Sequence, residues 1–257
     1  MNDSASKLKG LMWVVAACLV GAILALGLSP LAHAIPFSWE DKIAYAIGSD
    51  FSAPECTGNP QAQELLQKLV QRIYPVYPED AAFTIHVRMA QDNTINAYAE
   101  LGGKITVNSG LLKHAQSPEE LAGVLAHEIG HVKHHHIMQG VITHMFTAQG
   151  ISMIFSGGSS SMAEWTNYFL NMSFTRSQEA QADEAGLERL QTAHVDNRGF
   201  RHFFERMEES DSAVAFISDH PSNSSRLEMI EKFTNRDVRP ILTQDDWKTL
   251  KNYCGDK

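Results

Sequence analysis

The residues with the clearest chemical potential in this chain of 257 residues form one short pattern, His127-Glu128-Ile129-Gly130-His131. On a helix, His127 and His131 share one face, so both imidazoles can reach a single ion. Zinc binds imidazole nitrogen readily and tolerates a mixed nitrogen and oxygen shell. Glu128 points beside such an ion, where it can take a proton from bound water and pass it to a leaving amine. The pattern therefore predicts metal-assisted hydrolysis.

A catalytic zinc site needs a third protein ligand and one open position. The metzincin pattern would require Gly at position 134 and His at 137, and this chain has His134 and Ile137. His135 continues the His127/His131 stripe, but it lies another full turn along the helix. We therefore expect His135 at the surface rather than in the same tetrahedron.

A better third ligand lies in the segment 176–186. Glu179, Ala182, Asp183 and Gly186 fall on one face of a predicted helix, and the two small residues allow a close approach to a neighbouring helix. Glu179 can then supply a carboxylate oxygen to zinc. Asp183 can accept the free ring N–H of a ligand histidine and so fix its orientation. The alternative is an ordinary solvated acidic face.

Both motifs require helices, and the sequence supplies them. Ser117-Pro118 followed by Glu120 predicts a capping box that starts a helix running through His136. A second helix is predicted from Thr175 to Thr192. The other predicted elements are helices at 60–73, 199–209, 224–234 and 245–253, and strands at 82–89, 94–99 and 104–108, the last two joined by a Gly102-Gly103 turn. The apolar segment 141–156 is short and carries His144, which predicts a buried or interface helix. The predicted fold class is α+β, mostly helical, with a small sheet beside the helix of the histidine pair.

The N-terminal segment predicts export. Basic residues precede the apolar run Leu11–Leu28, and Ala32-His33-Ala34 follows it. Residues 1–34 are thus a signal peptide cleaved after Ala34 or a retained membrane anchor, and residues 35–257 form the folded domain. A lipoprotein box ending at Cys18 is not expected to function, because the apolar run continues past it. The positive-inside rule places the domain outside the cytoplasm.

Charge and cysteine content narrow the partners and ligands further. The net charge of -9 argues against a nucleic-acid partner, which would require a basic face. Cys56 and Cys254 bracket the domain, and in an oxidising compartment they could pair, or they could stay as two free thiols. No cysteine motif with metal-ligand spacing occurs, so cysteine is not expected to bind the metal.

Taken in order, these motifs resemble those of the HtpX-type and CAAX-prenyl-protease-type zinc metallopeptidases, which are gluzincins, and most of all their small exported bacterial members. The resemblance spans Gln61 to Arg239 and rests on Asn96-Ala97-Tyr98-Ala99, Gly102–Ile105 leading to Gly110-Leu111-Leu112, His127–His131, the Glu179–Gly186 segment, and His220-Pro221 followed by Arg226. It implies a zincin-type domain with one zinc per chain, His127, His131 and Glu179 as ligands, and Glu128 as general base.

The resemblance also implies how substrate is bound. The strand 104–108 would border the cleft, where an extended polypeptide could pair with its edge. His220 and Arg226 would lie near the metal and contact substrate or the developing oxyanion. His220 could instead cap the zinc in a resting state, and a polar turn opened by Pro221 is the simpler alternative.

The expected function is that of a zinc metalloendopeptidase in the periplasm, soluble or anchored to the inner membrane. Its expected substrates are unfolded or extended polypeptides, such as misfolded or damaged envelope proteins. Prenylated tails are not expected, because this chain has at most one membrane span. Two other classes remain open. A chaperone with a structural zinc site is one, although the intact Glu128 opposes it. A metal-storage module built on His134–His136 is the other.

Overall fold

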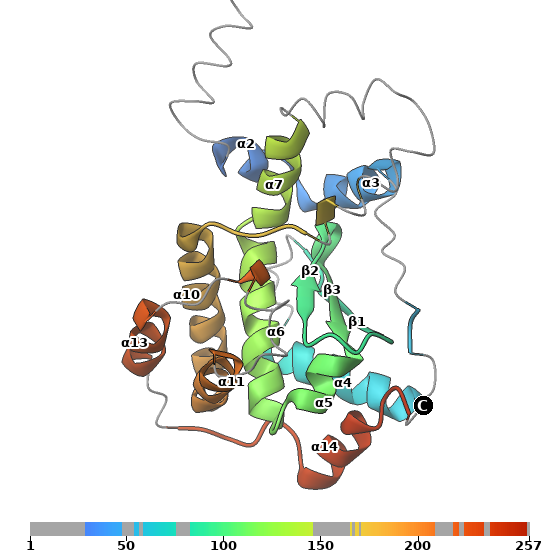
Figure 1. Ribbon diagram of the computed structural model, residues 1–257, viewed down its shortest axis with the longest axis vertical. Helices are drawn as coiled ribbons and strands as arrows, with labels where there is room; N and C mark the ends of the chain where they lie inside the picture. Colours follow the sequence, from blue (N-terminus) through green and yellow to red (C-terminus); the bar gives the residue numbers. More distant parts are fainter. Residues whose placement is uncertain are drawn as a thin grey trace, which may run out of the picture.

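A buried helix, α6 (Pro118–Lys133), runs through the middle of the molecule (Figure 1). The computed structural model describes residues 29–47, 54–56, 59–75, 83–145, 165, 168–169, 171–208, 218–220, 224–233 and 237–255. Ser117 caps α6 by accepting a hydrogen bond from the backbone N–H of Glu120, and Pro118 takes the first helical position. Every residue from Leu121 to Val132 is buried. The motif helix is therefore a core helix, shielded on all sides.

The predicted capping box forms only in part. The carboxylate of Glu120 accepts from the N–H of Gln116, at 2.9 Å, rather than from the N–H of Ser117. The guanidinium of Arg206 on α11 (Arg198–Glu208) lies 2.5 Å and 2.9 Å from its two oxygens. This partly buried ion pair between distant segments redirects the Glu120 side chain, and a local motif cannot predict it.

One side of α6 is covered by α10 (Arg176–Thr192) and α11, and α13 (Ser224–Lys232) packs on these two helices. Thr175 and Gln178 form the capping box that begins α10. Small residues let the two backbones touch, as predicted: a Cβ on Gly130 would lie 2.5 Å from the carbonyl oxygen of Ala182. The α6–α10 contact is thus fixed by residues at van der Waals distance from main chain.

The other side of α6 faces a mixed three-stranded sheet in the order β1-β3-β2 (Figure 1). The strands are β1 (His86–Ala90), β2 (Ala97–Ala99) and β3 (Lys104–Asn108), with the 3-10 turn η2 (Leu101–Gly103) before β3. Strand β3 pairs in parallel with β1 and antiparallel with β2. It is the central strand, so the expectation that its edge receives a peptide is wrong. The edge on that side belongs to β2.

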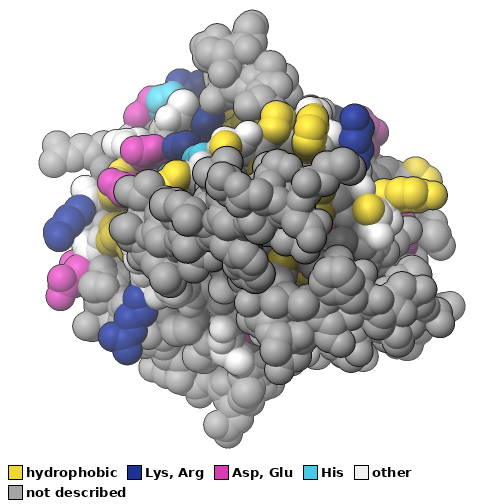
Figure 2. All heavy atoms as spheres, turned by 90° about the horizontal axis from the view of Figure 1, so that it is seen from above, with side chains coloured by type: hydrophobic (Ala, Val, Ile, Leu, Met, Phe, Trp, Pro, Cys, Tyr) yellow, Lys and Arg dark blue, Asp and Glu magenta, His cyan; other side chains and the backbone are white. Residues whose placement is uncertain are grey.

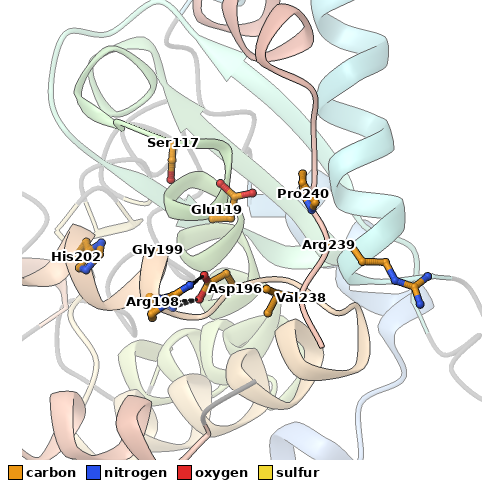
Figure 3. Close-up of a pocket in the computed structure, with 9 residues that line it drawn as sticks. All are labelled: Ser117, Glu119, Asp196, Arg198, Gly199, His202, Val238, Arg239 and Pro240. Carbon is orange, nitrogen blue, oxygen red and sulfur yellow. Dashed lines mark hydrogen bonds and ion pairs between the residues drawn. The ribbon is translucent and has the colours of Figure 1, made fainter. Parts of the chain in front are cut away.

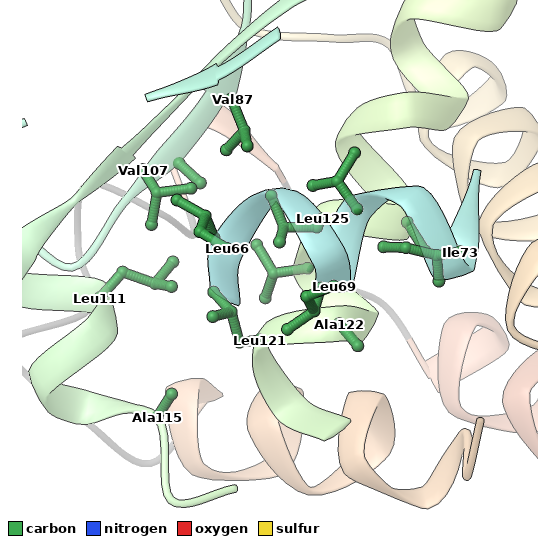
Figure 4. Packing of buried hydrophobic residues seen from close by; sticks show 14 of the residues in the cluster. Leu66, Leu69, Ile73, Val87, Val107, Leu111, Ala115, Leu121, Ala122 and Leu125 are labelled. Carbon is green, nitrogen blue, oxygen red and sulfur yellow. The ribbon is translucent and has the colours of Figure 1, made fainter. Parts of the chain in front are cut away.

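The main core fills the space between the sheet, α6 and α4 (Pro60–Ile73) (Figure 4). Leu66 of α4 points toward Val107 of the sheet, and Leu69 of α4 lies beside Ala122 of α6. Helices α5 (Ser109–His114) and α14 (Gln244–Lys251) close the lower end of the molecule. The predicted combination of mostly helices with a small sheet beside the motif helix is confirmed.

A disulfide joins Cys56 to Cys254, which settles the alternatives left open for these cysteines. The segment around Cys56 lies along the outer edge of β1, where the N–H of Cys56 donates to the carbonyl of Met89 at 2.9 Å. Cys254 follows α14, which packs on α4. The bond therefore ties the last helix to the sheet.

The predicted helix through His136 breaks at its end. Helix α6 stops at Lys133, His135 has a φ of 52°, and a separate helix, α7 (His136–Met145), starts after it. His135 is not a surface residue as predicted: it is buried, its Nδ1 lies 2.9 Å from an oxygen of Glu40, and its ring stacks on Phe37 at 3.9 Å. The covering residues come from α3 (Phe37–Ile47), a contact that local spacing does not predict.

A second, smaller core joins α2 (Ser29–His33), α3 and α7 at the upper end of the molecule. Ala32, inside the predicted signal or anchor segment, is fully buried there. Leu31, Trp39, Tyr45 and Met145 on these helices are exposed, and Figure 2 shows hydrophobic side chains among charged ones on this face. Within the described part of the chain, no helix has the length and apolarity needed to span a membrane. Residues 1–28 and 146–156 lie outside the described residues.

Candidate metal centre

Four buried side chains point their donor atoms at one another: His127 and His131 from α6, Glu179 from α10, and His220. The Nε2 atoms of the two α6 histidines are 3.0 Å apart, and Nδ1 of His220 lies 3.1 Å from Nε2 of His127. The Glu179 carboxylate oxygens lie 3.5, 3.3 and 3.2 Å from His127, His131 and His220. The sequence-predicted ligands His127, His131 and Glu179 thus come together in space.

These separations suit a tetrahedral zinc site. Zinc–nitrogen and zinc–oxygen bonds of about 2.0–2.2 Å at tetrahedral angles place neighbouring donor atoms roughly 3.3–3.5 Å apart. Five neighbouring pairs of donor atoms in the cluster lie 3.0–3.5 Å apart, and all four donors lie within 4.8 Å of one another. Three imidazole nitrogens and one carboxylate oxygen also form the mixed donor set that zinc accepts. The residues present therefore fit zinc.

His127 is oriented from behind by a carboxylate. Its Nδ1 lies 2.8 Å from an oxygen of Asp183, one turn after Glu179 on α10. The other Asp183 oxygen accepts from Nε of Arg226 at 2.5 Å, and the same guanidinium donates to Glu179 at 2.5 Å. The Arg226 guanidinium carbon also lies 4.2 Å from the centre of the Phe204 ring. Arg226 is thus buried behind the two α10 carboxylates and holds both.

The Glu179 carboxylate is stabilised in its charged form. Burial alone would raise its pKa, but hydrogen bonds from His131 and His220 outweigh burial, so the pKa of Glu179 lies well below its usual range. Burial lowers the pKa of His131 far below its ordinary value, with the Glu179 hydrogen bond opposing the shift. A charged carboxylate beside a neutral imidazole is the protonation state that a metal requires of its ligands.

Glu128 lies beside the cluster, fully buried. One oxygen, Oε2, accepts the backbone N–H of Ala99 at 2.9 Å. The other, Oε1, has no hydrogen-bond partner among the described residues, and Nε2 of His220 is 3.4 Å from it. Burial raises the pKa of Glu128, with the charges of His220 and His127 opposing. An orphaned, buried carboxylate oxygen is where a bound water or a polar substrate atom would be expected.

The backbone N–H that donates to Glu128 belongs to Ala99 of strand β2. The N–H of Asn108 donates to the carbonyl of Asn96, and the N–H of Glu100 donates to the carbonyl of Lys104. Because antiparallel pairs alternate, the backbone polar groups of Ala97 and Ala99 then face away from β3. The outer edge of β2 therefore lies directly beside Glu128. The motif containing Ala99 was visible in the sequence, but the donor role of its N–H was not.

His220 reaches the cluster from a short segment, residues 218–220. The amide of Asn96 donates to the carboxylate of the neighbouring Asp219 at 2.8 Å, which ties this segment to the end of β2. Burial alone would lower the pKa of His220, but Glu128 and Glu179 outweigh it and the pKa is raised. His220 thus lies with His127, His131 and Glu179 as a fourth donor that could hold a metal. Pro221 lies outside the described residues.

With the geometry established, residues 59–234 were found to match the model of Peptidase family M48. The chain belongs to Peptidase family M48. This confirms the metallopeptidase resemblance at the level of the family, whereas the narrower HtpX-type and prenyl-protease-type branches are not distinguished.

Several named M48 proteins are similar to this chain. It is 30% identical over 65% of its length to the mitochondrial metalloendopeptidase OMA1 of Schizosaccharomyces pombe. It is 26% identical over 62% of its length to the beta-barrel assembly-enhancing protease of Escherichia coli, and 29% over 56% to metalloprotease LoiP of the same bacterium. The matches cover 52%, 36% and 60% of these relatives' own lengths. The similarity thus concerns the M48 domain and not the whole of any relative.

A pocket of about 310 Å³ lies elsewhere on the M48 domain, where α6 and α11 begin (Figure 3). Its lining residues are Ser117, Glu119, Asp196, Arg198, Gly199, His202, Val238, Arg239 and Pro240. None of them belongs to the metal cluster. Arg198 is paired with Asp196 inside it, at 2.5 Å, so its charge is already neutralised. The pocket is separate from the candidate metal centre.

Proposed function

We propose that this protein is a zinc-dependent endopeptidase. The observation that carries the proposal is the buried convergence of His127, His131 and Glu179 at tetrahedral spacing, with the Glu128 carboxylate beside them. The named relatives, a metalloendopeptidase and two proteases, support the same activity. Because the chain spans only part of those relatives, the activity of the whole protein is an inference from its site.

His127, His131 and Glu179 would hold the zinc, which when bound supplies a Lewis acid and lowers the pKa of a water molecule. Glu128 would accept a proton at the unpartnered Oε1 and return it to the leaving amine. Its other oxygen is fixed by Ala99, so the carboxylate cannot rotate freely. Burial raises the pKa of Glu128, which suits a group that must both take and give a proton near neutrality.

Substrate would bind as an extended strand along the outer edge of β2, in place of the β3 edge expected from the sequence. The backbone groups of Ala97 and Ala99 face outward there, and Ala99 already contacts Glu128. Recognition of this kind uses main-chain hydrogen bonds and tolerates many side chains. It suits unfolded or extended polypeptides.

His220 would cap the metal centre in a resting state. Its Nδ1 lies 3.1–3.2 Å from His127 and Glu179, in the place of the water or substrate oxygen. Substrate entry would then require residues 218–220 to move. In a His220→Ala variant, we expect higher turnover of a short peptide than in wild type. Turnover that falls instead would support the alternative role, contact with the oxyanion.

Arg226 would position Asp183 and Glu179 rather than touch substrate, because it is buried and its guanidinium donates to both carboxylates. This differs from the oxyanion contact that the family resemblance implied.

The cell envelope is the proposed location, with misfolded or damaged envelope proteins as substrates. The export signal in the sequence and two bacterial relatives support this, one named for β-barrel assembly. A third relative is named as mitochondrial, so the relatives do not share one compartment. The burial of Ala32 supports retention of residues 1–34 as an anchor over cleavage after Ala34. N-terminal sequencing of the exported protein would decide.

The decisive test compares wild type with Glu128→Gln for zinc content and casein cleavage. We expect one zinc per chain in both proteins and a loss of roughly 10²–10⁴-fold in cleavage for the variant. Equal and absent cleavage in both would favour a chaperone with a structural zinc site. Several weakly held ions per chain would favour metal storage, although His135 and His136 are buried and engaged with Glu40 and His131.

A further inference from the structure

His136 is a buried histidine that the mechanism above does not use. It is the first residue of α7, and the residue before it, His135, has a positive φ of 52°. The His136 ring lies against that of His131, with ring centroids 5.0 Å apart and planes at 71°. The two Nδ1 atoms lie 3.0 Å apart, and on the far side Nε2 of His136 lies 3.0 Å from Oε1 of Gln181.

If His131 is a metal ligand, that role fixes which ring nitrogens of His131 and His136 carry protons. Its Nε2 points into the metal cluster, 3.3 Å from Glu179, so a ligand role requires a lone pair on that atom. The proton of the neutral ring must then be on Nδ1, where it donates to Nδ1 of His136. His136 must accept there and carry its own proton on Nε2, which donates to Gln181. Each ring nitrogen of His131 and His136 then has a partner.

His136 is fully buried between His131 and Gln181, and each of its ring nitrogens has a partner there. An imidazole suits the local charge at this position better than a carboxylate would. Glu128, Glu179 and Asp183 already place three carboxylates around the cluster. A further carboxylate in the place of His136 would add repulsion among buried negative charges.

Gln181 connects the hydrogen bonds of His131 and His136 to helix α10. It lies on α10 between Glu179 and Asp183. The same helix thus supplies a candidate ligand, the carboxylate that orients His127, and the amide that ends the chain from His131.

We propose that His136 and Gln181 are positioning residues that fix the tautomer and orientation of His131, and that they set the zinc affinity of the site. The inference rests on the proposed function only in requiring a zinc site, not in requiring peptide cleavage. Partners of this kind typically account for about 10- to 100-fold in metal affinity.

The test measures the zinc dissociation constant by chelator competition, and the visible spectrum of the cobalt-substituted protein. His136→Phe keeps a ring but removes the acceptor, and His136→Asn restores an acceptor oxygen near the Nδ1 position. His134→Phe is the matched control, because its ring lies 5.5 Å from that of His136 and it sits on the turn without contacting the cluster.

We expect His136→Phe to weaken zinc binding about 10- to 100-fold and to alter the cobalt spectrum. His136→Asn should recover most of the affinity, and His134→Phe should match wild type. The melting temperature of the zinc-free proteins is measured alongside, so that packing is separated from positioning. Wild-type affinity and spectrum in His136→Phe would overturn the proposal, as would equal losses in His136→Phe and His136→Asn.

Gln181→Leu provides a second test in case the His136 variants fail to fold. Position 181 is exposed, so this substitution should not disturb folding. It should weaken zinc binding at least about twofold, and an unchanged dissociation constant would count against the proposal. If wild type binds zinc tightly but cleaves no peptide, the proposed function fails while this inference stands. If wild type cleaves peptide and His136→Phe keeps full zinc affinity, the inference alone fails.

Discussion

At the scale of single residues, Arg226 is the side chain on which two buried carboxylates depend. It lies 2.5 Å from both Asp183 and Glu179 and is itself buried. Arg226→Met would remove the one arginine cation that holds both of these buried negative charges. We expect the free energy of unfolding of the zinc-free protein to fall by about 3–5 kcal/mol, measured by urea denaturation.

Arg201 provides the comparison for this prediction. It forms ion pairs with Glu205 and Glu231 at the surface, where solvent screens them. Arg201→Met should therefore cost less than about 1 kcal/mol. Similar losses in the two variants would show that burial does not distinguish these arginines.

The residue scale also shows what the sequence can and cannot predict. His127, His131 and Glu179 come together as their helical spacing predicted, because spacing on a helix fixes which side chains share a face. His136 was missed as a structural partner of His131. Its role depends on the left-handed backbone at His135, which the contacts to α3 stabilise, and such tertiary contacts leave no local pattern.

At the scale of elements, the contact between α6 and α10 sets the distance from the histidine pair to Glu179. A Cβ added at Gly130 would lie 2.5 Å from the carbonyl oxygen of Ala182. Gly130→Ala would force α10 away from α6 and carry Glu179 with it. We expect zinc affinity to drop at least about tenfold and stability to fall by about 1–3 kcal/mol, measured by chelator competition and urea denaturation.

Gly140 on α7 offers a matched control. A Cβ there would meet the ends of the Met172 and Tyr168 side chains, at 3.0 Å, rather than backbone. Side-chain ends can rotate away, so Gly140→Ala should leave zinc affinity unchanged. Wild-type affinity in Gly130→Ala would mean that α10 does not determine the position of Glu179.

Element boundaries followed the sequence where local chemistry decides them. The helix at 60–73 and the strand at 104–108 have the predicted ends, because Asn59 caps α4 and the Gly102-Gly103 turn, with both φ values at 75°, starts β3. The strand order was not predictable. Pairing β3 with β1 on one side and β2 on the other depends on non-local contacts, so the proposed substrate edge is on β2 and not on β3 as expected from the sequence.

At the scale of the whole molecule, the Cys56–Cys254 disulfide connects the two ends of the main core. Its 198-residue separation means that the bond removes much conformational entropy from the unfolded chain. Replacing both cysteines with serine should lower the free energy of unfolding by about 2–5 kcal/mol. The measurement is urea denaturation, with reductant expected to weaken wild type and to leave the double variant unaffected. A wild type indifferent to reductant would contradict the prediction.

The same bond closes the polypeptide between Cys56 and Cys254 into a covalent ring. This ring contains α6, α10 and all four residues of the metal cluster. An endopeptidase, the activity proposed above, would be exposed to cleavage by copies of itself. One cut inside the ring would leave a nicked molecule whose pieces remain attached and can stay folded together. In a reducing compartment the same cut would leave two fragments with no covalent bond between them. The redox state of the surroundings therefore determines whether one cut divides the molecule into two separate chains.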